Sequence, residues 1–176
     1  MSGEIVTAGY RWSILFLAFF CLSGWAADRS VAVSEGLLGN TNYGLFVEAL
    51  QKTVFWQQIV DAESVTVFVP SDTSLENEGS AFLLKVVLQK KENLERLHDL
   101  VAQHVYHLQD ISLETMSTPR TFSNILGGCT TVTPSGEKSV RVGPEAFVTG
   151  HENFANGDIY FIDRLLWQAY DSDISC

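Results

Sequence analysis

Histidine and cysteine are the side chains of this sequence with the greatest potential for chemistry, because both bind metals and act as bases or nucleophiles. His98, His104 and His107 lie close together, whereas His151 is isolated and Cys129 follows a pair of glycines. A structural zinc site needs four ligands, and no cysteine or carboxylate joins these histidines at ligand spacing. Cys129 has no basic neighbour in the sequence that would favour its thiolate. We therefore predict no catalytic, metal-binding or cofactor-binding residues.

His104 is better explained as a core residue, because it lies seven positions after Leu97 and continues the apolar stripe of a predicted helix. A buried histidine is usually neutral, with its ring hydrogen-bonded to nearby backbone or side-chain groups. The residues alone leave one alternative open. In that alternative the protein is a small secreted enzyme or ligand-binding protein that uses His104, His107 or Cys129.

The central element of the predicted fold is a strand at Val65–Val69, which consists entirely of β-branched and aromatic residues. The lack of alternation between apolar and polar residues predicts that both faces of this strand are buried. Pro70 has no N–H group and ends the strand, and Ser71 or Asp72 can then cap a helix. We therefore expect a central strand that leads directly into a helix.

Helical periodicity dominates the first part of the chain, and short β-like runs separated by turn residues dominate the second part. One predicted helix has an apolar face that comprises Phe82, Leu83, Val86 and Val87. Asn156-Gly157 is a strong hairpin signal before a strand at Ile159–Ile162, which Leu165–Trp167 are expected to continue. Helices followed by strands favour an α+β fold over repeating βαβ units.

The N-terminal segment 1–26 has the features of a secretory signal peptide. Arg11 precedes an apolar run at Ile14–Leu22, and Gly24 and Ala26 are small residues before a cleavage point. The run is short for a membrane span, so we expect none after cleavage; an uncleaved anchor is the alternative. The remaining chain is expected to comprise a flexible lead-in (27–40), one domain (41–170) and a polar tail (171–176).

The formal net charge of −10 disfavours binding to nucleic acid or to anionic lipid. The sequence contains no Asn-x-Ser/Thr glycosylation site, which favours a bacterial periplasm over a eukaryotic secretory route. Cys129 and Cys176 remain after cleavage and can form a disulfide in an oxidising compartment. A free Cys176, or a bond from it to another protein, is an equally open outcome.

Three stretches in order resemble the fasciclin domain family. They are TVFVPSDTSL at Thr66–Leu75, LHDLVAQHV at Leu97–Val105 and ANGDIYFIDRLL at Ala155–Leu166. The sequence departs from the family at Leu75, which is usually aromatic, and at Gln103, which is usually tyrosine. The resemblance identifies as motif residues Pro70, Ser71, Asp72, His104, Asn156, Gly157 and Asp163.

This resemblance implies an α+β fold in which a wedge of two β-sheets is flanked by several α-helices. It also implies a non-enzymatic module for adhesion or protein–protein interaction, secreted or periplasmic and without a cofactor. Its expected partners are other envelope or cell-surface proteins, in a homo- or hetero-oligomer or as a structural subunit of a larger assembly. We expect Trp167 and Tyr170 to contact partners, because aromatic residues anchor interfaces and this pair lies where the domain ends.

Overall fold

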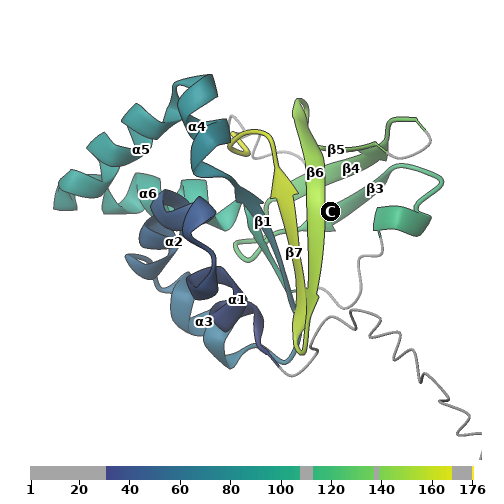
Figure 1. Cartoon of the computed structure of the whole chain (residues 1–176), viewed down its shortest axis with the longest axis horizontal. Coiled ribbons are helices and arrows are strands. Elements are labelled where there is room, and N and C mark those ends of the chain that lie inside the picture. Colours follow the sequence, from purple (N-terminus) through teal and green to yellow (C-terminus); the bar gives the residue numbers. More distant parts are fainter. Residues whose placement is uncertain (1–30, 108–112, 137–138, 168–175) are drawn as a thin grey trace, which may run out of the picture.

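The computed structural model of the chain describes residues 31–107, 113–136, 139–167 and Cys176. Within these ranges most helices precede most strands, and the helices lie on one side of the β-sheet (Figure 1). The helices are α1 (Val33–Gly39), α2 (Gly44–Gln51), α3 (Phe55–Asp61), α4 (Asp72–Glu78), α5 (Ser80–Gln89) and α6 (Leu94–Ala102). The strands are β1 (Val65–Pro70), β2 (Val105–Tyr106), β3 (Arg120–Ser123), β4 (Cys129–Pro134), β5 (Val140–Val142), β6 (Ala146–Phe154) and β7 (Gly157–Ile162). The predicted α+β class is confirmed.

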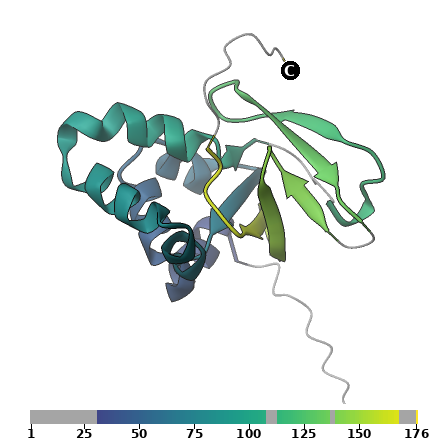
Figure 2. The same cartoon turned by 90° about the horizontal axis from the view of Figure 1, so that it is seen from above.

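The strands follow one continuous order, β2-β1-β7-β6-β5-β4-β3, and fall into two sheets that meet at β6. One end of β6 pairs with β5 and the rest pairs with β7, with a register shift between Val148 and Gly150. β1 and β7 are parallel, whereas the other neighbours are antiparallel. Seen from above, β3–β5 lead away from β1 and β7 (Figure 2), so the expected wedge of two sheets is confirmed.

Apolar clusters cover both faces of the first sheet, and β1 contributes to both of them. Val65, Val67 and Val69 pack with the helices, whereas Phe68 packs with Tyr106 and with residues of the second sheet. All six residues of β1 are buried. This two-sided burial is the reason that the β1 sequence shows no alternation, and it confirms the predicted central strand.

The predicted flexible lead-in at 27–40 is wrong for its second half, which contains α1. Val33 and Leu37 lie one helical turn apart and are almost completely buried in the helical cluster. The Val33 N–H donates to Asn156 Oδ1 at 2.8 Å, and this bond satisfies one free donor of the first turn. Such a short helix is stabilised by contacts with distant residues, which local periodicity cannot reveal.

Helix α5 buries a different side from the one that its apolar residues indicate. Ala81 and Leu84 are its buried residues, whereas Phe82 is 70% exposed and Leu83 is 56% exposed. Of the predicted apolar face, only Val87 packs against the helical cluster, whereas Phe82, Leu83 and Val86 are exposed. Large apolar side chains are left in contact with solvent instead.

The predicted hairpin forms between β6 and β7, but its loop residues are Ala155 and Asn156, because Gly157 already pairs with Phe154. Gly157 has a φ of 145°, and a Cβ atom at this position would collide with the carbonyl oxygen of Val65. The glycine is therefore required by the close approach of β1 as well as by the turn. Asn156 joins distant segments, since its Nδ2 also donates to the carbonyl oxygen of Ala62 at 2.9 Å.

The predicted signal peptide at 1–26 lies outside the described residues, as do Tyr170 and all of the tail except Cys176. No helix within the described ranges is both long enough and apolar enough to cross a membrane.

Candidate interaction surface

Pro70, Ser71 and Asp72 connect the central strand to two helices. Pro70 is the last residue of β1, and the Ser71 hydroxyl accepts a hydrogen bond from the Ser74 N–H at 3.0 Å as the N-cap of α4. The Asp72 carboxylate accepts from the Leu45 N–H at 3.1 Å, in the first turn of α2. Ser71 and Asp72 therefore satisfy backbone donors of two helices, which is a structural role.

His104 is completely buried at the end of α6, and both of its ring nitrogens are hydrogen-bonded. Nδ1 lies 2.9 Å from the carbonyl oxygen of Leu100, and Nε2 lies 3.0 Å from the Leu166 amide nitrogen. Because a carbonyl only accepts and an amide N–H only donates, Nδ1 carries the proton and Nε2 is the acceptor. Burial lowers the pKa of His104 to about 4, so the ring is neutral near pH 7. Neither nitrogen is available to a metal or to a substrate.

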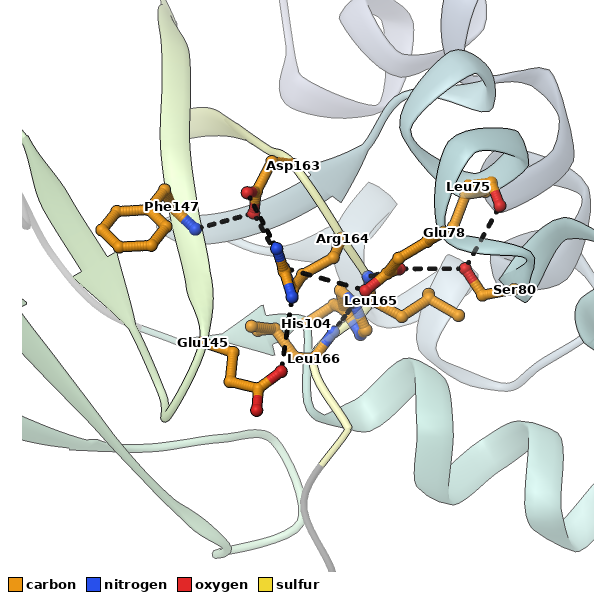
Figure 3. Close-up of polar contacts among 10 residues, drawn as sticks. All are labelled: Leu75, Glu78, Ser80, His104, Glu145, Phe147, Asp163, Arg164, Leu165 and Leu166. Atoms are coloured by element: carbon orange, nitrogen blue, oxygen red, sulfur yellow. Dashed lines mark hydrogen bonds and ion pairs between the residues drawn. The ribbon is translucent and has the colours of Figure 1, made fainter.

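The segment from Asp163 to Trp167 leaves the sheet after β7, so its predicted continuation as a strand is wrong. Phe147 of β6 forms two bonds with Asp163, one to its backbone N–H at 3.0 Å and one to its carboxylate at 2.8 Å. The next amides donate to side chains instead of a neighbouring strand, Leu165 to Glu78 at 3.4 Å and Leu166 to His104. Figure 3 shows this segment held between β6 and the α4–α5 region.

Arg164 is the ionic centre of the same segment. Its guanidinium group lies 3.4 Å from Asp163, 3.7 Å from Glu78 and 3.3 Å from Glu145 (Figure 3). The hydrogen bond to Asp163 is the largest cause of a raised pKa at Arg164, and the charges of the three carboxylates act in the same direction. These contacts connect the segment to α4 and to the residue that precedes β6.

A groove of about 410 Å³ lies beside this segment, where α5 and α6 approach it. Its lining is mainly apolar and includes Leu83 of α5, Leu100 of α6 and Leu165. Trp167 also lines the groove while remaining 68% exposed. The α5 face, as we name it, comprises the exposed side chains Phe82, Leu83, Val86 and Trp167.

Basic residues are frequent in the stretch of sequence that contains α5, although the chain as a whole is acidic. Between residues 79 and 96 the sequence has four basic residues and two acidic ones, although the whole chain has a net charge of −10. The basic residues are Lys85, Lys90, Lys91 and Arg96, all exposed. Glu78 also lines the groove, so the excess of basic residues is limited to this stretch of α5 and α6.

The other histidines and Cys129 do not form a reactive or metal-binding cluster among the described residues. Cys129 forms a disulfide with Cys176, with the two Cα atoms 5.6 Å apart, so its thiol cannot act as a nucleophile. His98 packs against Phe55, and His107 is exposed. In the part of the chain that the structure describes, no three histidine, cysteine or acidic side chains come together as metal ligands would. The alternative function, a small secreted enzyme or ligand-binding protein, therefore cannot depend on the His104 ring or on a free Cys129 thiol.

One pair of titratable side chains was missed by sequence reasoning. His151 Nε2 lies 2.7 Å from Asp158 Oδ1, and the Asp158 side chain is almost completely buried. The hairpin signal could have found this pair. It aligns Asn153 with Asp158, and His151 lies two residues from Asn153 on the same face of β6.

A model of the fasciclin domain matches residues 41–168 of the chain. The chain belongs to the fasciclin domain family. Its fasciclin domain is also similar to a solved structure, a FAS1 domain pair from the insect cell adhesion molecule fasciclin I. The TM-score is 0.62 at 15% sequence identity, over 78% of this chain and 51% of the insect chain. No curated protein matches the chain.

The insect structure shows the shared fold, and this chain spans about half of its length. The three motif stretches all lie within the matched region of the fasciclin domain. Helix α1 precedes that region and packs on the helical cluster. The family supports a module for protein interaction, and Trp167, one of the two aromatic residues predicted to contact partners, lies on the α5 face.

Proposed function

We propose that this fasciclin domain is a non-enzymatic, extracytoplasmic module that binds another envelope or cell-surface protein through the α5 face. The partner's contact surface is apolar with an acidic rim. In this role the protein is a structural subunit of a larger assembly or an adhesion module. The apolar side chains of the α5 face are the observation that carries the proposal.

Exposure of large apolar side chains is costly unless a partner covers them. Phe82 and Leu83 are adjacent on α5, Val86 follows one turn later, and Leu83 and Trp167 line the same groove. Contiguous apolar patches of this kind often mark interaction sites, whereas isolated exposed apolar residues do not. An exposed Phe on α5 and a Trp that lines the groove are also typical anchor residues of an interface.

The charge around the face determines which partner chemistry fits it. Lys85 lies on α5 between Phe82 and Val86, and Arg96 lines the groove. Basic side chains at the rim favour acidic groups on the partner and accelerate its association at low ionic strength. A nucleic-acid partner is disfavoured, because the chain as a whole has a net charge of −10 and repels phosphates.

The disulfide and the predicted signal peptide support the extracytoplasmic location. Disulfides such as Cys129–Cys176 persist in oxidising compartments and are rare in the cytosol. The apolar run at Ile14–Leu22 and the small residues before Ala27 are typical of a cleaved secretory signal. N-terminal sequencing of the protein from its native cells should therefore begin at Ala27, and a chain that still begins at Met1 would contradict this part of the proposal.

The interaction proposal is tested by affinity capture of a tagged chain from its native envelope, with two glutamate variants compared. Phe82→Glu places a charge on the α5 face, and Leu126→Glu places one at another exposed apolar site, after β3. We expect one envelope protein in fixed ratio with the wild type and with Leu126→Glu. Phe82→Glu should reduce its recovery about tenfold or more, as loss of an interface anchor does.

Circular dichroism and thermal unfolding of both variants establish that the substitutions leave the fold intact. Salt provides a second readout, because binding through a basic rim weakens as ionic strength rises. Equal recovery with both glutamate variants would contradict the assignment of the α5 face. Capture of only a second copy of this chain would contradict the proposal that the partner is a different envelope protein.

A further inference from the structure

The groove beside the α5 face runs along two antiparallel helices. Only residues 90–93 separate α5 from α6, so the end of α5 and the start of α6 lie at the same end of the pair (Figure 1). Leu83 and Val87 of α5 line the groove, as do Arg96 and Leu100 of α6. The two residues of each helix are four positions apart and therefore share one side of that helix. The groove thus lies lengthwise between the helices, with Arg96 near the connection.

The two charged residues among the described lining of the groove differ in whether they are paired. Glu78, directly before the start of α5, accepts hydrogen bonds from Ser80 Oγ at 3.1 Å and from the Leu165 N–H at 3.4 Å. Its carboxylate also lies 3.7 Å from the guanidinium group of Arg164. Arg96 is exposed and forms no hydrogen bond or ion pair with any residue that the structure describes. The unpaired charge of the groove is therefore positive, and a carboxylate on the occupant would complement it.

The walls of the groove suit a helix better than an extended segment. They consist largely of side chains from α5 and α6, whose backbone groups are bonded within each helix. An extended segment would leave its own N–H and C=O groups unpaired against these apolar side chains, whereas a helix pairs them internally. The residue spacing fits as well. Leu83 and Val87 are one helical turn, about 6 Å, apart along α5, and a docked helix presents its anchor side chains at this interval.

We propose that the groove receives an amphipathic helix of the partner, which places apolar side chains against Leu83, Val87 and Leu100 and a carboxylate against Arg96. This inference rests on the proposed function, to which it adds the form of the partner's contact segment and the residue that selects it. Because Arg96 and Leu100 are one turn apart, the acidic residue of the partner helix lies three or four positions from an apolar anchor. The guanidinium group can bind this carboxylate through two parallel hydrogen bonds.

Two charge reversals test the role of Arg96 by affinity capture of the tagged chain from its native envelope. Arg96 and Lys91 are both basic and exposed, but only Arg96 is part of the groove lining. We expect Arg96→Glu to reduce recovery of the envelope protein about tenfold or more, because it places like charges together. Lys91→Glu should leave recovery within about twofold of the wild type. Circular dichroism of both variants establishes that the fold is intact.

A third variant, Arg96→Lys, tests the form of the partner segment. It retains the positive charge and supplies an amine, which a carbodiimide couples to a neighbouring carboxylate. Cross-linking of the captured complex, followed by mass spectrometry, should join position 96 to an aspartate or glutamate of the envelope protein. Alanine substitutions along the cross-linked segment should then lower recovery at every third or fourth residue, which is the period of a helix face.

The outcomes separate this inference from the proposed function. Recovery that falls with Phe82→Glu but not with Arg96→Glu would leave the α5 face in place and overturn the inference. Losses at every second residue of the cross-linked segment would also overturn it, because they indicate a strand. Full recovery with Phe82→Glu, or capture of no envelope protein, would instead contradict the proposed function and remove this inference with it.

Discussion

The buried imidazole of His104 makes the stability of the fold depend on pH. Burial lowers its pKa from 6.5 to about 4, so between these values the unfolded chain binds a proton that the folded chain does not. This contribution to stability is fully present above about pH 6.5 and is lost as the pH falls towards 4. At about 1.4 kcal/mol per pH unit, the loss is about 2 kcal/mol between pH 7 and pH 5.

The substitution that isolates this effect is His104→Gln. The glutamine amide can donate and accept hydrogen bonds but does not titrate. At pH 7 we expect the variant to lose about 1–2 kcal/mol, because one amide group cannot reproduce both bonds of the imidazole. At pH 5 the wild type has lost about 2 kcal/mol through His104, so the gap between the two proteins should close.

Urea unfolding at pH 7, 6 and 5, followed by circular dichroism, measures this difference. His107→Gln is the matched control, because His107 lies three residues after His104 and is exposed. This variant should show the same pH dependence of stability as the wild type. Contributions from the other titrating groups cancel when the proteins are compared. The reasoning is refuted if His104→Gln loses as much stability between pH 7 and pH 5 as the wild type does.

Three further substitutions test individual contacts by urea unfolding at pH 7. Gly157→Ala should cost at least about 3 kcal/mol, because its Cβ meets the Val65 carbonyl oxygen at a φ that disfavours alanine. Thr66→Val should add about 1 kcal/mol, because the buried Thr66 hydroxyl has no hydrogen-bond partner among the described residues. Cys176→Ser should cost about 4 kcal/mol by opening a 47-residue loop, and added reductant should bring the wild type to the same stability without affecting the variant.

The parts of the fold that the sequence predicts correctly are those where local chemistry and burial agree. β1 is an uninterrupted run of β-branched and aromatic residues, and it is buried on both faces. The hairpin at Asn156 follows from turn chemistry, although its register differs by one residue. That shift arises because Gly157 is needed opposite Val65, a contact with a strand far away in the sequence. Local pattern therefore gave the element but not its register.

Helix α5 shows why the interaction surface could be predicted only in part. Periodicity marks the largest apolar residues as a buried face, but the helix buries the smaller Ala81 and leaves Phe82 in solvent. A pattern reports that apolar residues share a side of a helix, and it does not report whether this chain or a partner covers them. Trp167, which lies where the domain ends, is exposed, and its contact with a partner stays a prediction.

His104 connects the family motif to the proposed interface. Its Nε2 holds the amide of Leu166, the residue directly before Trp167, while Asp163 and Arg164 hold the start of the same segment. Trp167 is therefore presented by a backbone whose polar groups are bonded to the domain core and to α4. His104 and Asp163 thus determine where the exposed Trp167 side chain stands, so they act on the proposed interface by positioning this residue.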